Sequence, residues 1–128
     1  MVTHGNLGQE LLNTCEMIAG KQENAEAIGL FYDDDINELS KKVSEKIGQL
    51  DQGDGVIVFT DLYGGSPNSH TAVNLRTQSF QQITGANMPM LLECFSMRGS
   101  MSVGELASYV KEQGAGGIKL INELIKVN

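Results

Sequence analysis

The sequence predicts an α/β fold built on a parallel sheet, and two observations carry this prediction. Short β-rich segments alternate along the chain with longer segments of helical periodicity, which is the pattern of strands joined by right-handed crossover helices. Residues 55–60 read GVIVFT, an apolar run with almost no alternation, as expected for a strand that helices cover on both faces. Because the chain has 128 residues, we expect residues 1–128 to form a single domain.

Each element can be placed from its own residues. A strand stub at residues 1–3 is followed by apolar residues at helical spacing from Leu7 to Ile18, and Gly20 is a typical helix stop. The remaining predicted elements are a strand at 25–32, a helix whose apolar stripe runs from Ile36 to Ile47, the strand at 55–60, a helix at 69–78, a strand at 80–84, and helices at 88–97 and 103–113. Residues 118–121 form a short apolar run whose strand or helix character stays open.

The composition excludes several classes of function. A net charge of −7 with only nine basic residues argues against nucleic-acid binding, which needs clustered Lys and Arg to neutralise phosphates. The sequence has neither an apolar run long enough to cross a bilayer nor a signal-peptide pattern, so we expect a cytoplasmic protein. Cys15 and Cys94 lack metal-ligand spacing and lie in apolar stretches, which predicts buried, reduced thiols.

The strongest candidate for chemistry is a histidine at the carboxyl end of the first strand. Ligand sites of open parallel sheets lie at this edge, and His4 stands there. Asp61 directly follows the strand at 55–60. In a sheet of order 2-1-3-4 the two strands are neighbours, so His4 and Asp61 would lie side by side. A carboxylate bonded to one imidazole nitrogen fixes the tautomer and leaves the other nitrogen as a nucleophile.

A glycine-rich turn follows Asp61 and is a candidate anion-binding loop. Gly64 and Gly65 would let backbone N–H groups approach an anion, and the Ser66 hydroxyl can donate a further hydrogen bond. Pro67 fits the first turn of the next helix, whose N-terminus favours a phosphoryl group. The turn is not a P-loop, because no GK[ST] follows. A simple tight turn capped by Ser66 is the alternative.

Of three other polar features, two are interpreted as structural. The acidic run 33–35 could suggest a magnesium site, but Asp is favoured before a helix, so we expect it to cap the helix near Ile36. His70 is expected to be solvated or locally bonded at the rim of the glycine-rich turn. For Arg98, contact with an anionic partner and capping of a helix remain equally open.

Three motifs, in this order, resemble the mannose-family enzyme IIA of the bacterial phosphoenolpyruvate-dependent sugar phosphotransferase system (PTS). They are VTHG at residues 2–5, DLYGGSP at 61–67 and ITGANMPMLLE at 83–93. The resemblance covers nearly the whole chain and implies a phosphotransferase of the histidine-carrier type, working without a metal or cofactor. It implies that His4 is phosphorylated by HPr and passes the phosphoryl group to a IIB component, which acts with the membrane components IIC and IID. It also implies that Asp61 orients the imidazole and that Ser66 binds the phosphoryl group.

The resemblance has further implications for fold and assembly. The family fold is a flavodoxin-like three-layer sandwich with four parallel strands in the order 2-1-3-4. An antiparallel C-terminal edge strand is exchanged between the subunits of a homodimer, and residues 118–121 would match it.

The sequence departs from the family pattern in two places. Family members usually have several apolar residues before THG, whereas here only Met1 and Val2 stand before Thr3. A central strand this short would weaken the sheet, and whether the start is truncated stays open. After GGSP the family often has an aromatic residue and then Asn, whereas here Asn68 and Ser69 follow. The second departure leaves the conformation of the loop and the preference for a partner protein open, but it does not involve His4 or Asp61.

Three alternatives belong beside this interpretation. The phosphocarrier subunit of dihydroxyacetone kinase shares the fold, but its first motif usually reads like SHS where this chain has THG at residues 3–5. A regulatory module, free-standing or part of a larger transcriptional regulator, is a second alternative. A flavin-binding protein is disfavoured, because the chain has no Trp and 5% aromatic residues to stack on a flavin.

Overall fold

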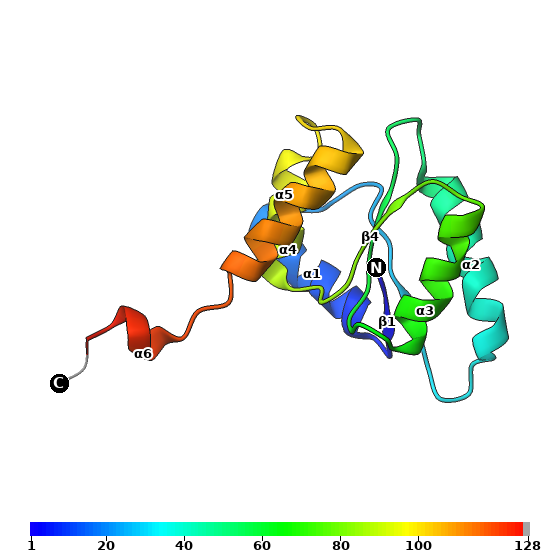
Figure 1. Cartoon of the computed structure of the whole chain (residues 1–128), viewed down its shortest axis with the longest axis horizontal. Helices are drawn as coiled ribbons and strands as arrows, with labels where there is room; N and C mark the ends of the chain where they lie inside the picture. Colours follow the sequence, from blue (N-terminus) through cyan, green and yellow to red (C-terminus); the bar gives the residue numbers. More distant parts are fainter. Residues whose placement is uncertain (127–128) are drawn as a thin grey trace.

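The computed structural model describes residues 1–126 and shows an α/β fold of short strands that pair in parallel (Figure 1). In chain order its elements are β1 (Val2–His4), α1 (Leu7–Ala19), β2 (Ile28–Leu30), the 3-10 turn η1 (Ile36–Glu38), α2 (Leu39–Leu50), β3 (Ile57–Phe59), α3 (Ser66–Ala72), the 3-10 turn η2 (Val73–Arg76), β4 (Gln81–Ile83), α4 (Met88–Met97), α5 (Val103–Gly116) and α6 (Ile121–Leu124). The predicted alternation of strands and helices is therefore confirmed, and α4 has the predicted bounds.

The strands form two parallel pairs. β1 pairs with β2, Val2 lying opposite Ile28, and β3 pairs with β4, Ile57 lying opposite Gln81. Within residues 1–126, one isolated parallel bridge between Val2 and Thr60 joins the two pairs. The contact between the first and third strands thus depends on a single bridge, where we had predicted a continuous sheet.

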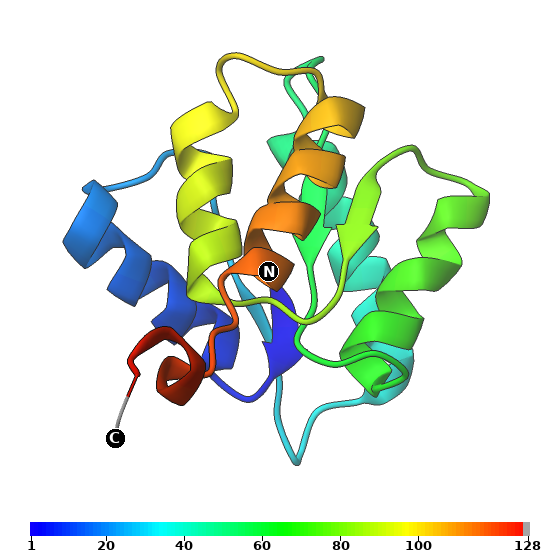
Figure 2. The same cartoon turned by 60° about the vertical axis from the view of Figure 1, so that its left-hand side comes forward.

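Helices lie on both sides of the strands. In Figure 1, α1, α4 and α5 lie on one side and α2 and α3 on the other; Figure 2 shows α4 and α5 in front of the strands. Each side has its own buried cluster, as expected when both faces of a strand are covered. One cluster joins α1, β3, α4 and α5: Cys15, Phe59, Met90, Leu91, Cys94, Leu106 and Val110. The other joins β1, α2 and β3: Val2, Leu39, Val43, Ile47, Val58 and Phe80.

Several predicted elements are shorter or shifted. The strand predicted at 25–32 pairs only over Ile28–Leu30, because its partner β1 offers three residues. The helix predicted at 69–78 begins earlier, at Ser66, since Gly65 has the extended backbone of an N-cap and Pro67 fits the first turn. α3 ends at Ala72, and a 3-10 turn covers much of the remaining prediction.

The C-terminal segment leaves the body of the fold. Residues 118–120 have no regular structure, α6 follows over Ile121–Leu124, and every residue from 115 to 126 is exposed. In Figure 1 this segment projects away from the helices. Among the described residues 1–126, segment 118–121 pairs with no strand, so the antiparallel edge strand implied for it is not formed there.

Candidate functional site

The candidate site lies at the carboxyl edge of the central strands. β1 ends at His4, and β3 is followed by Thr60 and Asp61. The bridge between Val2 and Thr60 holds these two strand ends next to each other. Since parallel strands end at the same edge of a sheet, the two polar side chains emerge together.

His4 and Asp61 are in direct contact. The Nδ1 atom of His4 lies 2.8 Å from Oδ2 of Asp61, and the backbone N–H of His4 donates to the same oxygen at 2.8 Å. The Asp61 side chain is 10% exposed, whereas the His4 side chain is 51% exposed. With Nδ1 held by the carboxylate, the Nε2 atom is the ring nitrogen left for chemistry.

Asp61 is held in its charged form. Burial by itself would raise the pKa of this carboxyl, but the hydrogen bonds from the backbone and ring of His4, together with the charge of the imidazolium, outweigh burial and lower the pKa below its usual value. A carboxylate at this position accepts from Nδ1–H and stabilises positive charge on the ring. Its second oxygen, Oδ1, is buried and has no hydrogen-bond partner among residues 1–126.

The GGSP loop (residues 64–67) passes beside the imidazole. Gly64 has a φ of +82°, a conformation that favours glycine. A Cβ placed on Gly65 would lie 3.0 Å from Cε1 and 3.7 Å from Nε2 of His4. Glycine at position 65 therefore leaves room between the loop backbone and the ring. Ser66 follows as the first residue of α3, and Pro67 is buried in its first turn.

A polar network that sequence reasoning missed ties the start of α3 to both strands of the second pair. The Thr60 hydroxyl, which is fully buried, donates to Oδ1 of Asn68 at 3.2 Å. The side-chain amide of Gln82 in β4 donates to Oδ1 and to the backbone carbonyl of Asn68, at 3.0 and 2.9 Å. Asn68 thereby fixes the GGSP loop relative to the strand end that carries Asp61. The sequence signal for this network was Asn68 itself, which stands directly after GGSP, where the family often has an aromatic residue.

The end of β1 is fixed by a second set of contacts that the sequence did not reveal. The buried Thr3 hydroxyl accepts a hydrogen bond from the backbone N–H of Gly8 at 2.8 Å, which anchors the first turn of α1. The backbone N–H of Gly5 donates to the Leu30 carbonyl at 2.7 Å, and Gly5 has a φ of +53°. The histidine is therefore flanked by Thr3, whose side chain is bonded to α1, and by Gly5, whose backbone is bonded to β2.

The other polar candidates have structural contacts. As predicted, Asp35 caps η1 by accepting from the Asn37 N–H at 2.9 Å, and Asp34 accepts from the Phe31 N–H at 2.8 Å. His70 is locally bonded, as expected: its Nδ1 lies 3.0 Å from the Ser66 carbonyl oxygen.

Arg98 and the two cysteines lie outside the site. The Arg98 guanidinium donates to the Gln22 side chain at 3.1 Å and to the Glu23 carbonyl at 2.8 Å, so its contacts tie α4 to the segment after α1. Cys15 and Cys94 are buried free thiols, which confirms that prediction. Burial raises the pKa of both thiols, to about 11 for Cys94.

The described residues hold neither a metal-binding cluster nor a helix that could span a membrane. Between residues 1 and 126, no group of three or more His, Cys, Asp or Glu side chains is placed to hold a metal ion. Over the same range, no helix has the length and apolar character to cross a membrane.

Fold and site together define a class of protein. An α/β chain of short parallel strands, with a histidine–aspartate pair and a GGSP loop at one edge, corresponds to the IIA components of sugar phosphotransferase systems. Residues 1–111 match the sequence model of the EIIA-man family, described as the PTS system fructose IIA component, and the chain belongs to this family. The resemblance drawn from the three sequence motifs is thereby confirmed.

Individual relatives agree with this assignment. The mannose-specific EIIAB component of Escherichia coli (strain K12) is 33% identical over 121 residues, which are 93% of this chain and 38% of that protein. The chain thus spans about two fifths of the length of this curated relative. Among solved structures, a IIA component from Streptococcus agalactiae superimposes with a TM-score of 0.86 at 25% identity, covering 95% of both chains. A IIA protein associated with the fucose utilization operon of Streptococcus pneumoniae gives 0.84 at 29% identity, covering 96% of this chain and 91% of that one.

Proposed function

We propose that this chain is a histidine phosphocarrier of a sugar phosphotransferase system, in which His4 accepts a phosphoryl group from phospho-HPr and passes it to a IIB component. The observation that carries the proposal is the contact between Nδ1 of His4 and the buried Asp61 carboxylate, at 2.8 Å. A half-exposed imidazole whose Nδ1 is engaged presents Nε2 to a partner protein. Membership of a IIA component family supports the same role.

The proposed transfer is an in-line exchange between two imidazoles. The lone pair on Nε2 of His4 attacks the phosphorus of phospho-HPr, a new P–N bond forms, and the P–N bond to the HPr histidine breaks. His4 keeps its Nδ1 proton in the bond to Asp61, so the ring's positive charge is stabilised as it develops. In the second step a histidine of the IIB component attacks the same phosphorus and His4 leaves as a neutral ring.

The GGSP loop is proposed to hold the phosphoryl oxygens. Because Gly65 has no Cβ, its backbone can lie beside the imidazole of His4. Ser66, the next residue in the chain, supplies a hydroxyl. Backbone N–H groups and a hydroxyl suit the oxygens of a phosphoryl group in transfer. Catalysis then consists of positioning and charge stabilisation, as phosphoryl transfer in general requires.

Partner proteins are proposed to dock over apolar side chains at the same edge. Phe31 and Tyr32 follow β2, Leu62 and Tyr63 follow Asp61, and all four are more than half exposed. Exposed aromatic and aliphatic side chains around a reactive group suit a protein partner. The net charge of −7 would steer partners with basic rims towards the chain.

Homodimer formation is proposed through the C-terminal segment. Ile118, Leu120, Ile121, Leu124 and Ile125 are 55–77% exposed. Burial of these apolar side chains against a second chain would stabilise a dimer. In the proposed dimer this segment is exchanged between the subunits, and residues 118–121 form an edge strand. The proposed location of the protein is the cytoplasm, beside the membrane components.

The test is transfer of label from phosphoenolpyruvate through enzyme I and HPr. We expect the chain to become labelled, with an acid-labile, base-stable bond typical of phosphohistidine, and His4→Ala to remove the label. His70→Ala is the matched control and should be labelled normally. Label that persists in the His4→Ala chain would rule out the proposed carrier residue, provided that its circular dichroism shows a folded protein.

A further inference from the structure

The turn that follows His4 lies directly on β2. Gly5 has a φ of +53°, and its backbone N–H donates to the Leu30 carbonyl at 2.7 Å. The Gly5 carbonyl oxygen lies over Gly29, so close that a Cβ built on Gly29 would collide with it. The chain therefore leaves His4 across a part of β2 that has no room for a side chain.

The ring of Phe31 borders the same place. A Cβ built on Gly29 would lie 2.8 Å from Cε2 and 3.0 Å from Cζ of Phe31. Phe31 as a whole is 53% exposed, so one edge of its ring lies against the backbone of β2 while much of the residue is open to solvent. We call the backbone of Gly29 and this ring edge the Gly29–Phe31 seat, on which the Gly5 peptide rests.

The place of Phe31 is fixed by a turn directly after β2. The backbone N–H of Phe31 donates to Oδ2 of Asp34 at 2.8 Å, and its carbonyl accepts from the Asp34 N–H at 3.1 Å. Two hydrogen bonds between the same residues set the direction in which the chain leaves β2. The backbone from which the ring projects is therefore held before any partner protein binds.

The seat bears on His4 because of the way in which parallel strands alternate. Successive residues of a parallel strand direct their N–H and C=O groups to opposite neighbours. The N–H of Gly5 points to β2, so the N–H of His4, one residue earlier, points towards β3, where it donates to Oδ2 of Asp61 at 2.8 Å. The imidazole meets the same oxygen at 2.8 Å. A displacement of Gly5 is therefore passed, across one peptide bond, to both hydrogen bonds that orient the imidazole.

We propose that Gly29 and Phe31 are positioning residues for His4, which hold the Gly5 peptide so that Nε2 of His4 faces the incoming phosphoryl group. This role rests on the proposed function, because it concerns the residue that takes up that group. The two residues act through Gly5 and not on the phosphoryl group itself. Small displacements of a reacting group cost large factors in rate, so the seat should matter for the transfer step.

Gly29→Ala tests the seat, because it adds one methyl group beneath the turn and removes no side chain from the docking surface. The Gly5 carbonyl must shift to make room. We expect the maximal rate of single-turnover transfer from phospho-HPr to fall at least about tenfold, while the half-saturating concentration of phospho-HPr stays within about twofold. The matched control is Gly48→Ala in α2, where a Cβ meets nothing within 4 Å. A wild-type maximal rate in folded Gly29→Ala would overturn the proposal.

Imidazole nitrogen NMR separates positioning from a general loss of stability. The bond to Asp61 predicts that neutral His4 carries its proton on Nδ1, and the two-bond ¹H–¹⁵N spectrum in alkaline solution reports which nitrogen is protonated. In folded Gly29→Ala we expect a mixture of both tautomers. An unchanged tautomer beside a slowed transfer would reject the seat. This measurement needs no phosphorylation, so it tests the seat even if an unlabelled wild-type chain refutes the proposed function.

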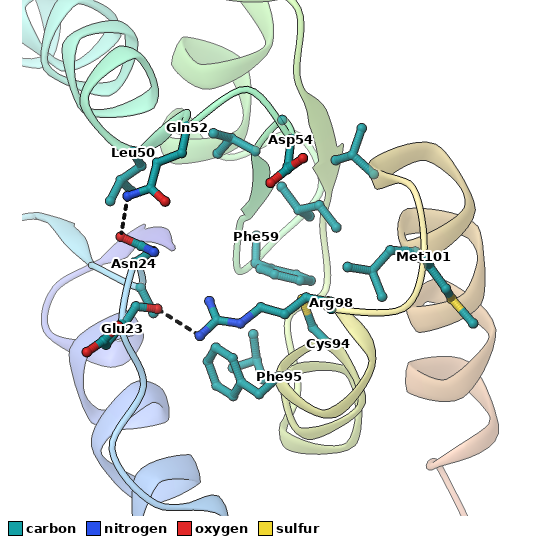
Figure 3. A pocket seen from close by; sticks show the side chains of 18 of the residues that line it. Glu23, Asn24, Leu50, Gln52, Asp54, Phe59, Cys94, Phe95, Arg98 and Met101 are labelled. Atoms are coloured by element: carbon teal, nitrogen blue, oxygen red, sulfur yellow. Dashed lines mark hydrogen bonds between the residues drawn. The ribbon is translucent and has the colours of Figure 1, made fainter.

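Phe31→Ala provides a second test, which carries the proposal if Gly29→Ala fails to fold. It takes the ring edge away from Gly29, so we expect a mixture of His4 tautomers and a lower maximal rate. The control is Phe95→Ala, which truncates a phenylalanine of α4 beside Arg98, at the edge of the strands opposite His4 (Figure 3). It should leave the tautomer and the maximal rate unchanged. If Phe31→Ala raises only the half-saturating concentration, Phe31 is a docking residue alone and the proposal fails.

Discussion

Asp61→Asn tests the electrostatic part of the proposed transfer most directly. One oxygen of Asp61 accepts two hydrogen bonds from His4, each of 2.8 Å. Asparagine keeps the size of the side chain and one acceptor oxygen, but it removes the negative charge. The substitution therefore separates charge from shape.

The magnitude follows from the number and type of these bonds. A hydrogen bond to a charged acceptor contributes about 1.5–3 kcal/mol, against about 0.5–1.5 kcal/mol for a neutral one. The ring bond strengthens as the imidazole gains positive charge in the transition state, and asparagine leaves a neutral acceptor in its place, so we expect the barrier to rise by the difference, about 1–1.5 kcal/mol. Transfer from phospho-HPr should then slow roughly tenfold.

The assay is rapid-quench transfer from labelled phospho-HPr, with Asp33→Asn as the matched control. Asp33 is an exposed aspartate of the run after β2, so its substitution should leave the rate unchanged.

Because the pKa of Asp61 is lowered in the folded chain, its contribution to stability is present above the unfolded carboxyl pKa and is lost as the pH falls through the folded value. Urea unfolding of Asp61→Asn should therefore show a weaker loss of stability on acidification. A variant that transfers at the wild-type rate would refute the assigned role of the carboxylate.

Three further predictions use other contacts. Gly65→Ala places a Cβ 3.0 Å from Cε1 of His4, so quench-flow should show transfer slowed roughly tenfold with little change in melting temperature; an unaffected rate would mean that the loop does not approach the reacting ring. Asn68→Ala removes the acceptor for Thr60 and Gln82, and urea titration should show about 1–3 kcal/mol lost, whereas a loss below about 0.5 kcal/mol would argue against the network. Because the pKa of the Met1 ammonium falls from 8.0 to about 6 on folding, the unfolded chain binds more protons between these values, and stability should rise by about 2 kcal/mol from pH 6 to pH 8. An N-acetylated chain should lack that rise, and its persistence would assign it to another group.

Several elements could be predicted because their signals are local. The stripe that includes Leu39, Val43 and Ile47 faces inward in α2 as the spacing indicated, and Met88–Met97 forms α4 with the predicted bounds. Strand lengths could not be predicted in this way. β2 and β3 end where their partners end, and pairing partners are distant in sequence.

For the candidate site, the residue types at the ends of β1 and β3 could be predicted from the chain alone, and the three motifs sufficed to indicate the family. That both the ring and the backbone N–H of His4 share one oxygen of Asp61 became visible only once the strands were placed side by side. The same holds for the bonds from Thr60 and Gln82 to Asn68, and for the departure of the C-terminal segment from the fold. The physical reason is that local spacing fixes helices and strand ends, whereas hydrogen bonds and burial between distant segments depend on how those elements pack.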